Sequence, residues 1–339
     1  ALCPGLRLVA VASGASEARA TAFAATLGAP ARAYGTRDAL LADPEVRLVY
    51  IANATERHAE DAIAALHAGK DVLVEKPIAL DAAGARAVAE AAATSGRYCA
   101  EAMWTAFLPA WRRLADIAAQ GDMGDPRHLS FSFGLPADRI GYARLFDGRP
   151  GGGVLLDRGV YGLALALKLL GPVEDVSAWI AAGASGADEE AAIQLRHRDG
   201  ATSQIAVSLN ALLGNEATLS CTRGSAGIDP PSLGGESVRV RWMAPLAPPA
   251  PGGGGKAAQI IARLKSKGAL RRLIGARGRL KREWHDRGAH SHLAMLTHAA
   301  QDIAAGRTQS EIAPLALSIE TMALLDRVRA AADDRTGDR

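Results

Sequence analysis

The sequence is poor in cysteine and in aromatic residues, and it contains no long run of apolar residues. Its three cysteines, Cys3, Cys99 and Cys221, are widely separated and form no Cys-x-x-Cys pair, which argues against a disulfide framework or a zinc site of that type. No apolar run approaches the roughly 20 residues of a membrane-spanning helix. We therefore expect reduced thiols, no metal site and a cytoplasmic location, although the start at Ala1 leaves room for a trimmed leader.

The charge is small overall but unevenly placed. The 339 residues are 49% apolar and 22% charged, so a large core and two domains can form. The net charge is +3, yet residues 256–287 contain 11 Lys and Arg against two acidic residues. This segment could bind nucleic acid, anionic lipid or an acidic partner. Because three glycines interrupt it, we expect instead a solvated helix or loop between the last sheet strand and the closing helices.

The first 120 residues alternate strand-like and helix-like segments. Continuous apolar runs predict strands at 6–12, 46–53, 70–76 and 97–102. Alanine-rich segments predict helices at 16–27, 56–68 and 81–95. Apolar strands separated by amphipathic helices are typical of a parallel sheet covered on both faces. We therefore expect an α/β, Rossmann-like dinucleotide-binding domain over residues 1–120.

From residue 121 onward, apolar and polar residues alternate along the chain. Period-two segments occur at 128–134, 175–182, 191–199, 202–210 and 216–221. This pattern is typical of an antiparallel sheet with one buried face. Helices are expected at 155–171, 289–305 and 313–332, and residues 245–256 have the composition of a linker. We expect an α+β domain with an open-faced, mainly antiparallel sheet over 121–310, and a C-terminal helix in 311–339 that packs back across the domains.

A glycine-rich loop is missing from the predicted dinucleotide-binding domain. The fingerprint G-x-G-x-x-G should lie about 20 residues before the strand-end position that Ser13 occupies. Only five residues precede the strand at 6–12, and the glycines of 151–153 belong to the other domain. We expect the first strand and the loop to lie upstream of residue 1, so that the parallel sheet lacks its first strand and binds pyrophosphate weakly.

Two motifs contain candidate catalytic residues. VEKPIAL (74–80) places Lys76 at the carboxyl end of a parallel strand, where ligands of open α/β sheets bind. In GGGVLLDRGVYGLAL (151–165), Asp157 and Tyr161 are four residues apart and share one helical face. A nearby ammonium such as Lys76 would lower a tyrosine pKa of about 10 toward the range useful for acid–base catalysis. A solvated turn at Lys76 and a buried, structurally capped Tyr161 are the alternative interpretations.

Taken in order, these motifs resemble those of the Gfo/Idh/MocA (glucose–fructose oxidoreductase/inositol dehydrogenase-like) oxidoreductases. The order is a strand with EKP (75–77), then AEAMW (100–104), then GGGVLLDRGVY (151–161). Within the family, the sequence is most similar to the branch of dihydrodiol dehydrogenases and NADP-dependent xylose dehydrogenases. The resemblance covers most of the chain outside residues 243–288. It implies a Rossmann domain, an open antiparallel sheet and an active site between them.

The resemblance also implies the reaction and the residues that perform it. Relatives move a hydride between a nicotinamide cofactor and a hydroxyl carbon of a sugar, polyol or cyclic diol. The catalytic roles fall to Lys76, Asp157 and Tyr161, with Tyr161 as acid and base and Lys76 as its assistant. Ala106 stands where close relatives have Arg. The expected cofactor contacts are Ser13, Asn53, Thr55, His58, Glu75, Lys76, Glu101 and Trp104.

The residue after the first apolar strand favours NADP over NAD. NAD-specific enzymes place Asp or Glu at this strand end to bind the ribose 2′-hydroxyl. Here Ser13 and Gly14 follow the strand and would not repel a 2′-phosphate, while Arg19 or Arg37 could supply the counter-charge.

Two further expectations concern partners and rival functions. Relatives commonly form homodimers or larger homo-oligomers that cover the open sheet face, and we expect the same here. A non-catalytic member of this fold that senses a ligand or regulates a partner is the alternative function. The intact Lys76, Asp157 and Tyr161 argue against that alternative, whereas the missing glycine loop argues for it.

Overall fold

The N-terminal part of the protein is built on short parallel strands. The structure, a computed structural model, describes residues 3–14, 16–28, 30–243 and 278–336. In the first of two ladders, β1 (Ala10–Ala12) pairs with β2 (Arg32–Tyr34). The second ladder has the order β3 (Leu48–Ile51), β4 (Asp71–Glu75) and β5 (Cys99–Ala102). The helices of this part are α1 (Glu17–Ala24), α2 (Arg37–Leu41), α3 (His58–His67) and α4 (Ala82–Ser95).

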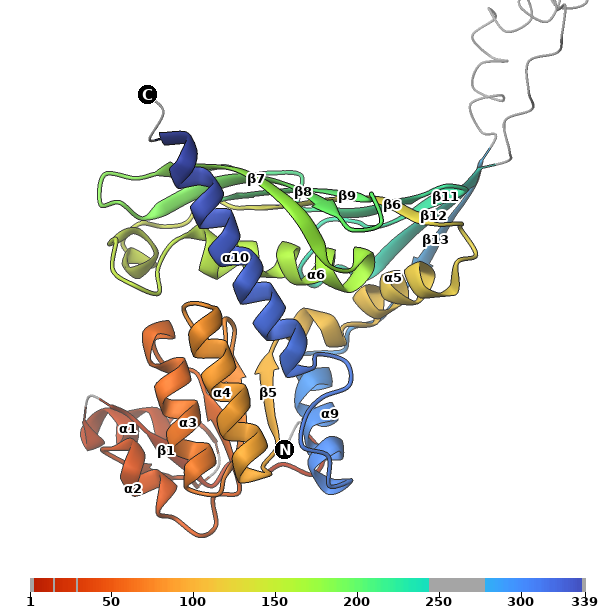
Figure 1. Ribbon diagram of the computed structural model, residues 1–339. Helices are drawn as coiled ribbons and strands as arrows, with labels where there is room; N and C mark the ends of the chain where they lie inside the picture. The colour runs from red at the N-terminus through yellow and green to blue at the C-terminus, as the bar shows by residue number, and fades with distance from the viewer. Residues whose placement is uncertain (1–2, 15, 29, 244–277, 337–339) are drawn as a thin grey trace, which may run out of the picture.

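The C-terminal part contains an eight-stranded sheet with the order β13-β12-β11-β10-β6-β9-β8-β7. Its strands are β6 (Pro126–Gly134), β7 (Val173–Ala182), β8 (Asp188–His197), β9 (Thr202–Ser208), β10 (Ala217–Cys221), β11 (Gly224–Ile228), β12 (Ser237–Met243) and β13 (Gly278–Trp284). Only β6 and β9 pair in parallel among these described strands. Figure 1 shows α5 (Pro109–Gln120) and α6 (Val160–Leu170) on one face of this sheet.

Helix α6 lies close against the middle of this sheet. Nearly all of its side chains are buried, because Leu, Ala and Val occupy every side of the helix. Gly162 faces the sheet, and a Cβ atom added there would lie 2.7 Å from Phe131 Cδ1 and 2.8 Å from Ile205 Cγ2. Glycine therefore allows α6 to approach β6 and β9 closely. This close packing sets the height of Tyr161 above the sheet.

Two C-terminal helices connect the parts. α10 (Leu315–Thr336) packs against β7 and α6 of the large sheet part and against α4 of the N-terminal part (Figure 1). Asp326 Oδ2 accepts a hydrogen bond of 2.9 Å from the Ala82 N–H at the start of α4. α9 (Leu293–Ala304) buries Met295 and Ala299 in a cluster with Leu73 of β4 and Ala100 of β5. Both helices therefore hold the N-terminal sheet next to the C-terminal part.

The expected fold class is confirmed, with corrections in detail. β2 and β11 were not predicted, because β2 has only three residues and β11 contains two glycines. β12 was also not predicted, although Ser237–Met243 alternates apolar and polar residues. The end of the basic segment forms the edge strand β13, not a solvated helix or loop, because it pairs with β12 from Ser237↔Trp284 to Met243↔Gly278. The predicted linker at 245–256 and the rest of the basic segment up to residue 277 lie outside the described residues. Domain boundaries at 120 and 310 and a homo-oligomeric state stay predictions. No helix of the described chain is long and apolar enough to span a membrane.

We expect Gly162→Ala to destabilise the protein. The added methyl group would overlap Phe131 and Ile205, which are each 1% exposed and have no room to move. Overpacking of this kind costs about 1–3 kcal/mol, against a gain of roughly 1 kcal/mol in helix propensity. Thermal unfolding should show a lower Tm. Gly214→Ala is the matched control, because its nearest neighbour would be 3.5 Å away. Equal Tm values for the two variants would contradict the close packing of α6.

Candidate active site

Lys76 follows the last residue of β4 and points toward the C-terminal part. Its Nζ donates to the backbone oxygen of Asp157 at 2.7 Å and to Asp157 Oδ1 at 3.0 Å. Only 14% of the Lys76 side chain is exposed. The peptide bond between Lys76 and Pro77 is cis. The structure thus brings together two predicted catalytic residues, Lys76 and Asp157, that are 81 positions apart in the sequence.

Asp157 lies on a π-helical turn, Leu155–Gly159, that leads into α6. Asp188 of β8 contacts the start of this turn, and its Oδ2 accepts a hydrogen bond of 2.6 Å from the Leu155 N–H. Burial raises the pKa of Asp188 above its usual value, although backbone N–H groups lower it in part. A Cβ atom on Gly153 would lie 2.0 Å from Asp188 Oδ1, so only glycine leaves room for this carboxylate. Asp188 and Gly153 therefore position the turn.

Tyr161, in the first turn of α6, is 4% exposed and lies beside Lys76. Lys76 Nζ is 5.0 Å from the centre of the Tyr161 ring. The Tyr161 hydroxyl accepts a hydrogen bond of 3.0 Å from Trp104 Nε1. Trp104 belongs to the short helix Trp104–Phe107, which follows β5. Lys76, Tyr161 and Trp104 thus meet between the two parts of the protein.

Opposing effects act on the pKa values of these groups. Burial raises the pKa of Tyr161, while the Lys76 charge and the Trp104 hydrogen bond lower it, and the net pKa lies above the usual value. Burial alone would lower the pKa of Lys76, but Tyr161, once ionised, and the Asp157 carboxylate raise it, and the net pKa is also higher than usual. Lys76 is therefore an ammonium, and Tyr161 is a protonated phenol at neutral pH. Lys76 lowers the pKa of Tyr161, as the sequence predicts, but burial raises this pKa by more.

Arg158, which was not predicted as a site residue, lies directly against Asp157. Its Nε is 3.5 Å from Asp157 Oδ2, and only 7% of the Arg158 side chain is exposed. Its Nη1 donates to the backbone oxygens of Leu135, at 2.7 Å, and of Ser208. Burial lowers the pKa of Arg158 from its usual value, and Asp157 opposes that shift. The carboxylate of Asp157 thus lies between two cations, Lys76 and Arg158.

A second polar group surrounds Glu75, one residue before Lys76. Glu75 Oε1 accepts a hydrogen bond from the Tyr50 hydroxyl, and Oε2 accepts the Lys76 N–H at 3.1 Å. His292 Nε2 lies 3.9 Å from Glu75 Oε1, and the His292 ring stacks on Trp104 with 5.2 Å between ring centres. Tyr50 and His292 were not predicted. His292 comes from the segment before α9, 131 residues after Tyr161, so no local spacing links the two.

Glu101 and His58 support the turn that follows Lys76. Glu101 is 3% exposed, and its Oε1 accepts the Ile78 N–H at 3.0 Å. Burial raises the pKa of Glu101, although hydrogen bonds from Ser318 and Ile78 lower it in part. His58 is 2% exposed, with Nδ1 2.7 Å from the Pro77 oxygen and Nε2 3.2 Å from the Asn53 oxygen. Both residues therefore contact the backbone of the turn at Pro77 and Ile78. A direct contact of either residue with the cofactor stays a prediction.

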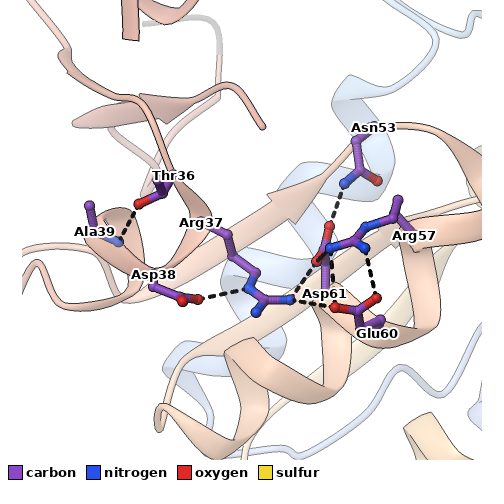
Figure 2. Close-up of polar contacts among 8 residues, drawn as sticks. All are labelled: Thr36, Arg37, Asp38, Ala39, Asn53, Arg57, Glu60 and Asp61. Atoms are coloured by element: carbon purple, nitrogen blue, oxygen red, sulfur yellow. Dashed lines mark hydrogen bonds and ion pairs between the residues drawn. The ribbon is translucent and has the colours of Figure 1, made fainter. Parts of the chain in front are cut away.

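The predicted cofactor residues near the other strands have different surroundings. Ser13 directly follows β1, and its N–H donates to the Tyr34 oxygen at 3.1 Å. Thr55 starts the short helix Thr55–Arg57, close to Gly151 of the C-terminal part. Asn53 donates from Nδ2 to Asp61. This contact belongs to a network in which Arg37 also binds Asp61, at 2.7 Å (Figure 2).

The network in Figure 2 includes Arg37, one of the two arginines that could neutralise the 2′-phosphate of NADP. Arg37 forms ion pairs with Asp38 at 3.0 Å, Glu60 at 3.2 Å and Asp61 at 2.7 Å. Three carboxylates therefore surround this guanidinium, and its pKa is raised above its usual value chiefly by the hydrogen bond to Asp38. Arg19 lies exposed in the first turn of α1, after Ser13 and Gly14. Of the two arginines considered, Arg19 is the better placed to meet an added negative charge.

Comparison with known proteins places both parts in one family. Residues 1–103 match the oxidoreductase family model with an NAD-binding Rossmann fold, and residues 111–227 match the GFO/IDH/MocA C-terminal domain. The trans-1,2-dihydrobenzene-1,2-diol dehydrogenase of Bos taurus is 34% identical over 251 residues, 73% of each chain. The human enzyme of the same name is 32% identical over 220 residues, which are 64% of this chain and 65% of that protein.

Solved structures show the same fold at lower identity. The aldose-aldose oxidoreductase of Caulobacter crescentus, complexed with glycerol, superposes with a TM-score of 0.78 at 22% identity, covering 98% of this chain and 91% of that chain. A 3-ketoreductase from Actinomadura kijaniata in complex with NADP gives a TM-score of 0.75 at 24% identity, over 96% of this chain and 89% of that chain. With the EKP lysine, the Asp157 turn and Tyr161 assembled between a Rossmann part and an open sheet, the chain belongs to the Gfo/Idh/MocA family of oxidoreductases.

Proposed function

We propose that this protein is an NADP(H)-dependent dehydrogenase or reductase that acts on a hydroxyl or carbonyl carbon of a sugar, polyol or cyclic diol. The observation that carries the proposal is the contact of Lys76 with Asp157 and with the buried Tyr161, between the two parts of the chain. A related dehydrogenase is named for a cyclic diol, and a structural neighbour is named for aldoses. A bound nicotinamide would supply the site that accepts or donates hydride.

Tyr161 exchanges a proton with the substrate oxygen in this proposal. When a carbonyl is reduced, the phenol donates its proton to the oxygen that gains charge. Lys76 supplies a fixed positive charge next to the same oxygen. Asp157 holds the Lys76 ammonium with its backbone oxygen and with Oδ1, at 2.7 and 3.0 Å, so the charge stays oriented. Lys76 and Tyr161 are little exposed, with 14% of the Lys76 side chain and 4% of Tyr161 accessible, and the loss of water strengthens these interactions.

The raised pKa of Tyr161 predicts opposite pH dependences for the two directions. The phenol is the active form for carbonyl reduction, so that rate should be constant near neutral pH and should fall as pH rises through the pKa of Tyr161. The phenolate is the active form for alcohol oxidation, so that rate should rise with pH. Tyr161→Phe should reduce turnover in both directions by about 10²–10⁴-fold. The measurement is steady-state kinetics at several pH values, and near-normal turnover of the Phe variant would refute the assignment.

Substitution of Arg158 tests whether the orientation of the Asp157 carboxylate matters for turnover. Arg158→Met removes the cation beside Asp157 Oδ2 and should lower kcat about tenfold, as expected for a barrier raised by roughly 1.4 kcal/mol. Arg327→Met is the matched control, because Arg327 also donates to two backbone oxygens, of Val173 at 2.9 Å and Glu174 at 2.7 Å. Both variants lose arginine–carbonyl bonds, but only the first touches the site. Equal kcat values would show that Arg158 has a purely structural role.

The preference for NADP rests on the end of β1. No carboxylate stands at Ser13 or Gly14 to repel a 2′-phosphate, and a Cβ atom on Gly14 would meet nothing within 4 Å. The residues at this point therefore fit a phosphorylated ribose, with Arg19 as the cation.

Thermal shift measurements test this preference. NADP(H) should raise Tm more than NAD(H), and Arg19→Met should remove most of the difference while leaving the NAD(H) shift unchanged. Arg37→Met is the control, since Arg37 is already engaged by Asp38, Glu60 and Asp61. It should lower Tm without ligand but keep the ratio of the two cofactor shifts. A larger shift with NAD(H) in the unaltered protein would overturn the preference.

A further inference from the structure

One contact between the two parts of the protein has no role in the chemistry described so far. Nη2 of Arg144, in the C-terminal part, donates a hydrogen bond to Oε2 of Glu56, in the N-terminal part, and the two residues are 88 positions apart. The backbones also come close here, since a Cβ atom on Gly151 would lie 3.2 Å from the Cβ atom of Thr55. The bridging segment, residues 143–157, therefore touches the N-terminal part before it reaches the catalytic turn.

The bridging segment makes its contacts near the ends of two neighbouring strands. Its partner Glu56 lies in the helix Thr55–Arg57, which follows β3, while its residue Asp157 binds Lys76, which follows β4. β3 and β4 pair in parallel, so their carboxyl ends lie at the same edge of the sheet. Ligands of open α/β sheets bind at this edge. The segment therefore spans the edge at which a dinucleotide would bind.

Hydrogen bonds within the bridging segment join it into one unit. The Leu145 oxygen accepts the Gly153 N–H at 3.1 Å, and the Gly153 oxygen accepts the Asp157 N–H at 3.2 Å. Of the two ends of the segment, the one at Asp157 has its own support from Asp188, which binds the start of the catalytic turn. The ion pair with Glu56 therefore determines chiefly the position of the other end.

We propose that Glu56 and Arg144 are positioning residues, whose ion pair holds the bridging segment across a nicotinamide cofactor bound at the carboxyl ends of β3 and β4. The inference rests on the proposed function. Neither residue exchanges a proton or a hydride with the substrate. Loss of the pair frees one end of the segment, so the cofactor dissociates more readily, whereas Lys76 and Asp157 keep their own hydrogen bonds. The pair should therefore affect cofactor affinity more than turnover.

Substitution of either residue tests the proposal. Side-chain exposure is 37% for Arg144 and 35% for Glu56, so both positions should tolerate a change without unfolding. Arg144→Met should raise the dissociation constant of NADPH about three- to fivefold, as expected for a half-exposed ion pair, and should leave kcat at saturating cofactor nearly unchanged. Glu56→Gln should have the same effect, and the two changes together should add little, because each alone removes the pair. Titration of NADPH fluorescence measures the dissociation constant.

Arg149→Met is the matched control, because Arg149 belongs to the same segment but donates to Asp147, from Nε at 2.7 Å. It should leave the dissociation constant unchanged. Charge reversal is a stricter test. Glu56→Arg alone places two guanidinium groups together and should weaken binding at least as much as Arg144→Met, whereas Glu56→Arg combined with Arg144→Glu should restore most of the affinity. Because salt screens an exposed pair, the difference between Arg144→Met and the unaltered protein should shrink in about 1 M NaCl.

A second measurement needs neither turnover nor cofactor. Amide hydrogen exchange at Gly153, whose N–H is bonded to the Leu145 oxygen, should be faster in Arg144→Met than in the unaltered protein. It should be slow again in the charge-reversed double variant. Exchange at Leu155, whose N–H is bonded to Asp188, should be the same in all of these proteins, because this bond does not depend on the ion pair.

The outcomes separate the inference from the proposed function. Equal dissociation constants in Arg144→Met and Arg149→Met, or no recovery in the charge-reversed double variant, would overturn the positioning role while leaving the dehydrogenase intact. Unchanged amide exchange at Gly153 in Arg144→Met would also overturn it. If the unaltered protein binds neither NADP(H) nor NAD(H), the proposed function is wrong. Faster exchange at Gly153 that charge reversal restores would then still support Glu56 and Arg144 as the contact that positions the segment.

Discussion

The contact between Lys76 and Asp157 is the constraint on which the site depends. A buried ammonium is unfavourable unless a partner charge and hydrogen-bond acceptors compensate it. Asp157 supplies both, through its carboxylate and its backbone oxygen. The two residues come from different parts of the chain, so this compensation exists only when the parts are docked. Docking in turn requires the close approach of the turn at Asp157, which Gly153 and Asp188 make possible.

The sequence predicts the elements of the site better than their surroundings. The centre of β4 is apolar, and α6 is largely apolar, so the type and position of both elements follow from the hydrophobic pattern. The positions of Lys76 and Tyr161 at their ends follow with them. Short strands such as β2, with three residues, contain too little pattern to be recognised. The strand β13 was missed because its charged residues suggest a solvated segment, although an edge strand tolerates such residues well.

The supporting residues could not be found because their partners are distant in sequence. Asp188 lies 33 residues from the Leu155 N–H that it accepts, and nothing local distinguishes it from other acidic residues in strands. Arg158 stands inside the recognised motif, but its side chain leaves the face shared by Asp157 and Tyr161. Its role appears only when the backbone oxygens of Leu135 and Ser208 are seen to converge on it. Contacts of this kind depend on the tertiary fold, which residue spacing does not encode.

Burial has two opposite effects on Tyr161: it strengthens the electrostatic interaction with Lys76, and it disfavours the charged phenolate. Exclusion of water strengthens the field of Lys76 at Tyr161, but it also disfavours the phenolate, and the second effect is the larger one. The same burial that keeps Tyr161 protonated separates its proton from solvent. A site that uses a buried phenol as an acid must therefore place a fixed positive charge beside it. Lys76 supplies this charge, and its two hydrogen bonds to Asp157 keep the ammonium in place when the surrounding water is excluded.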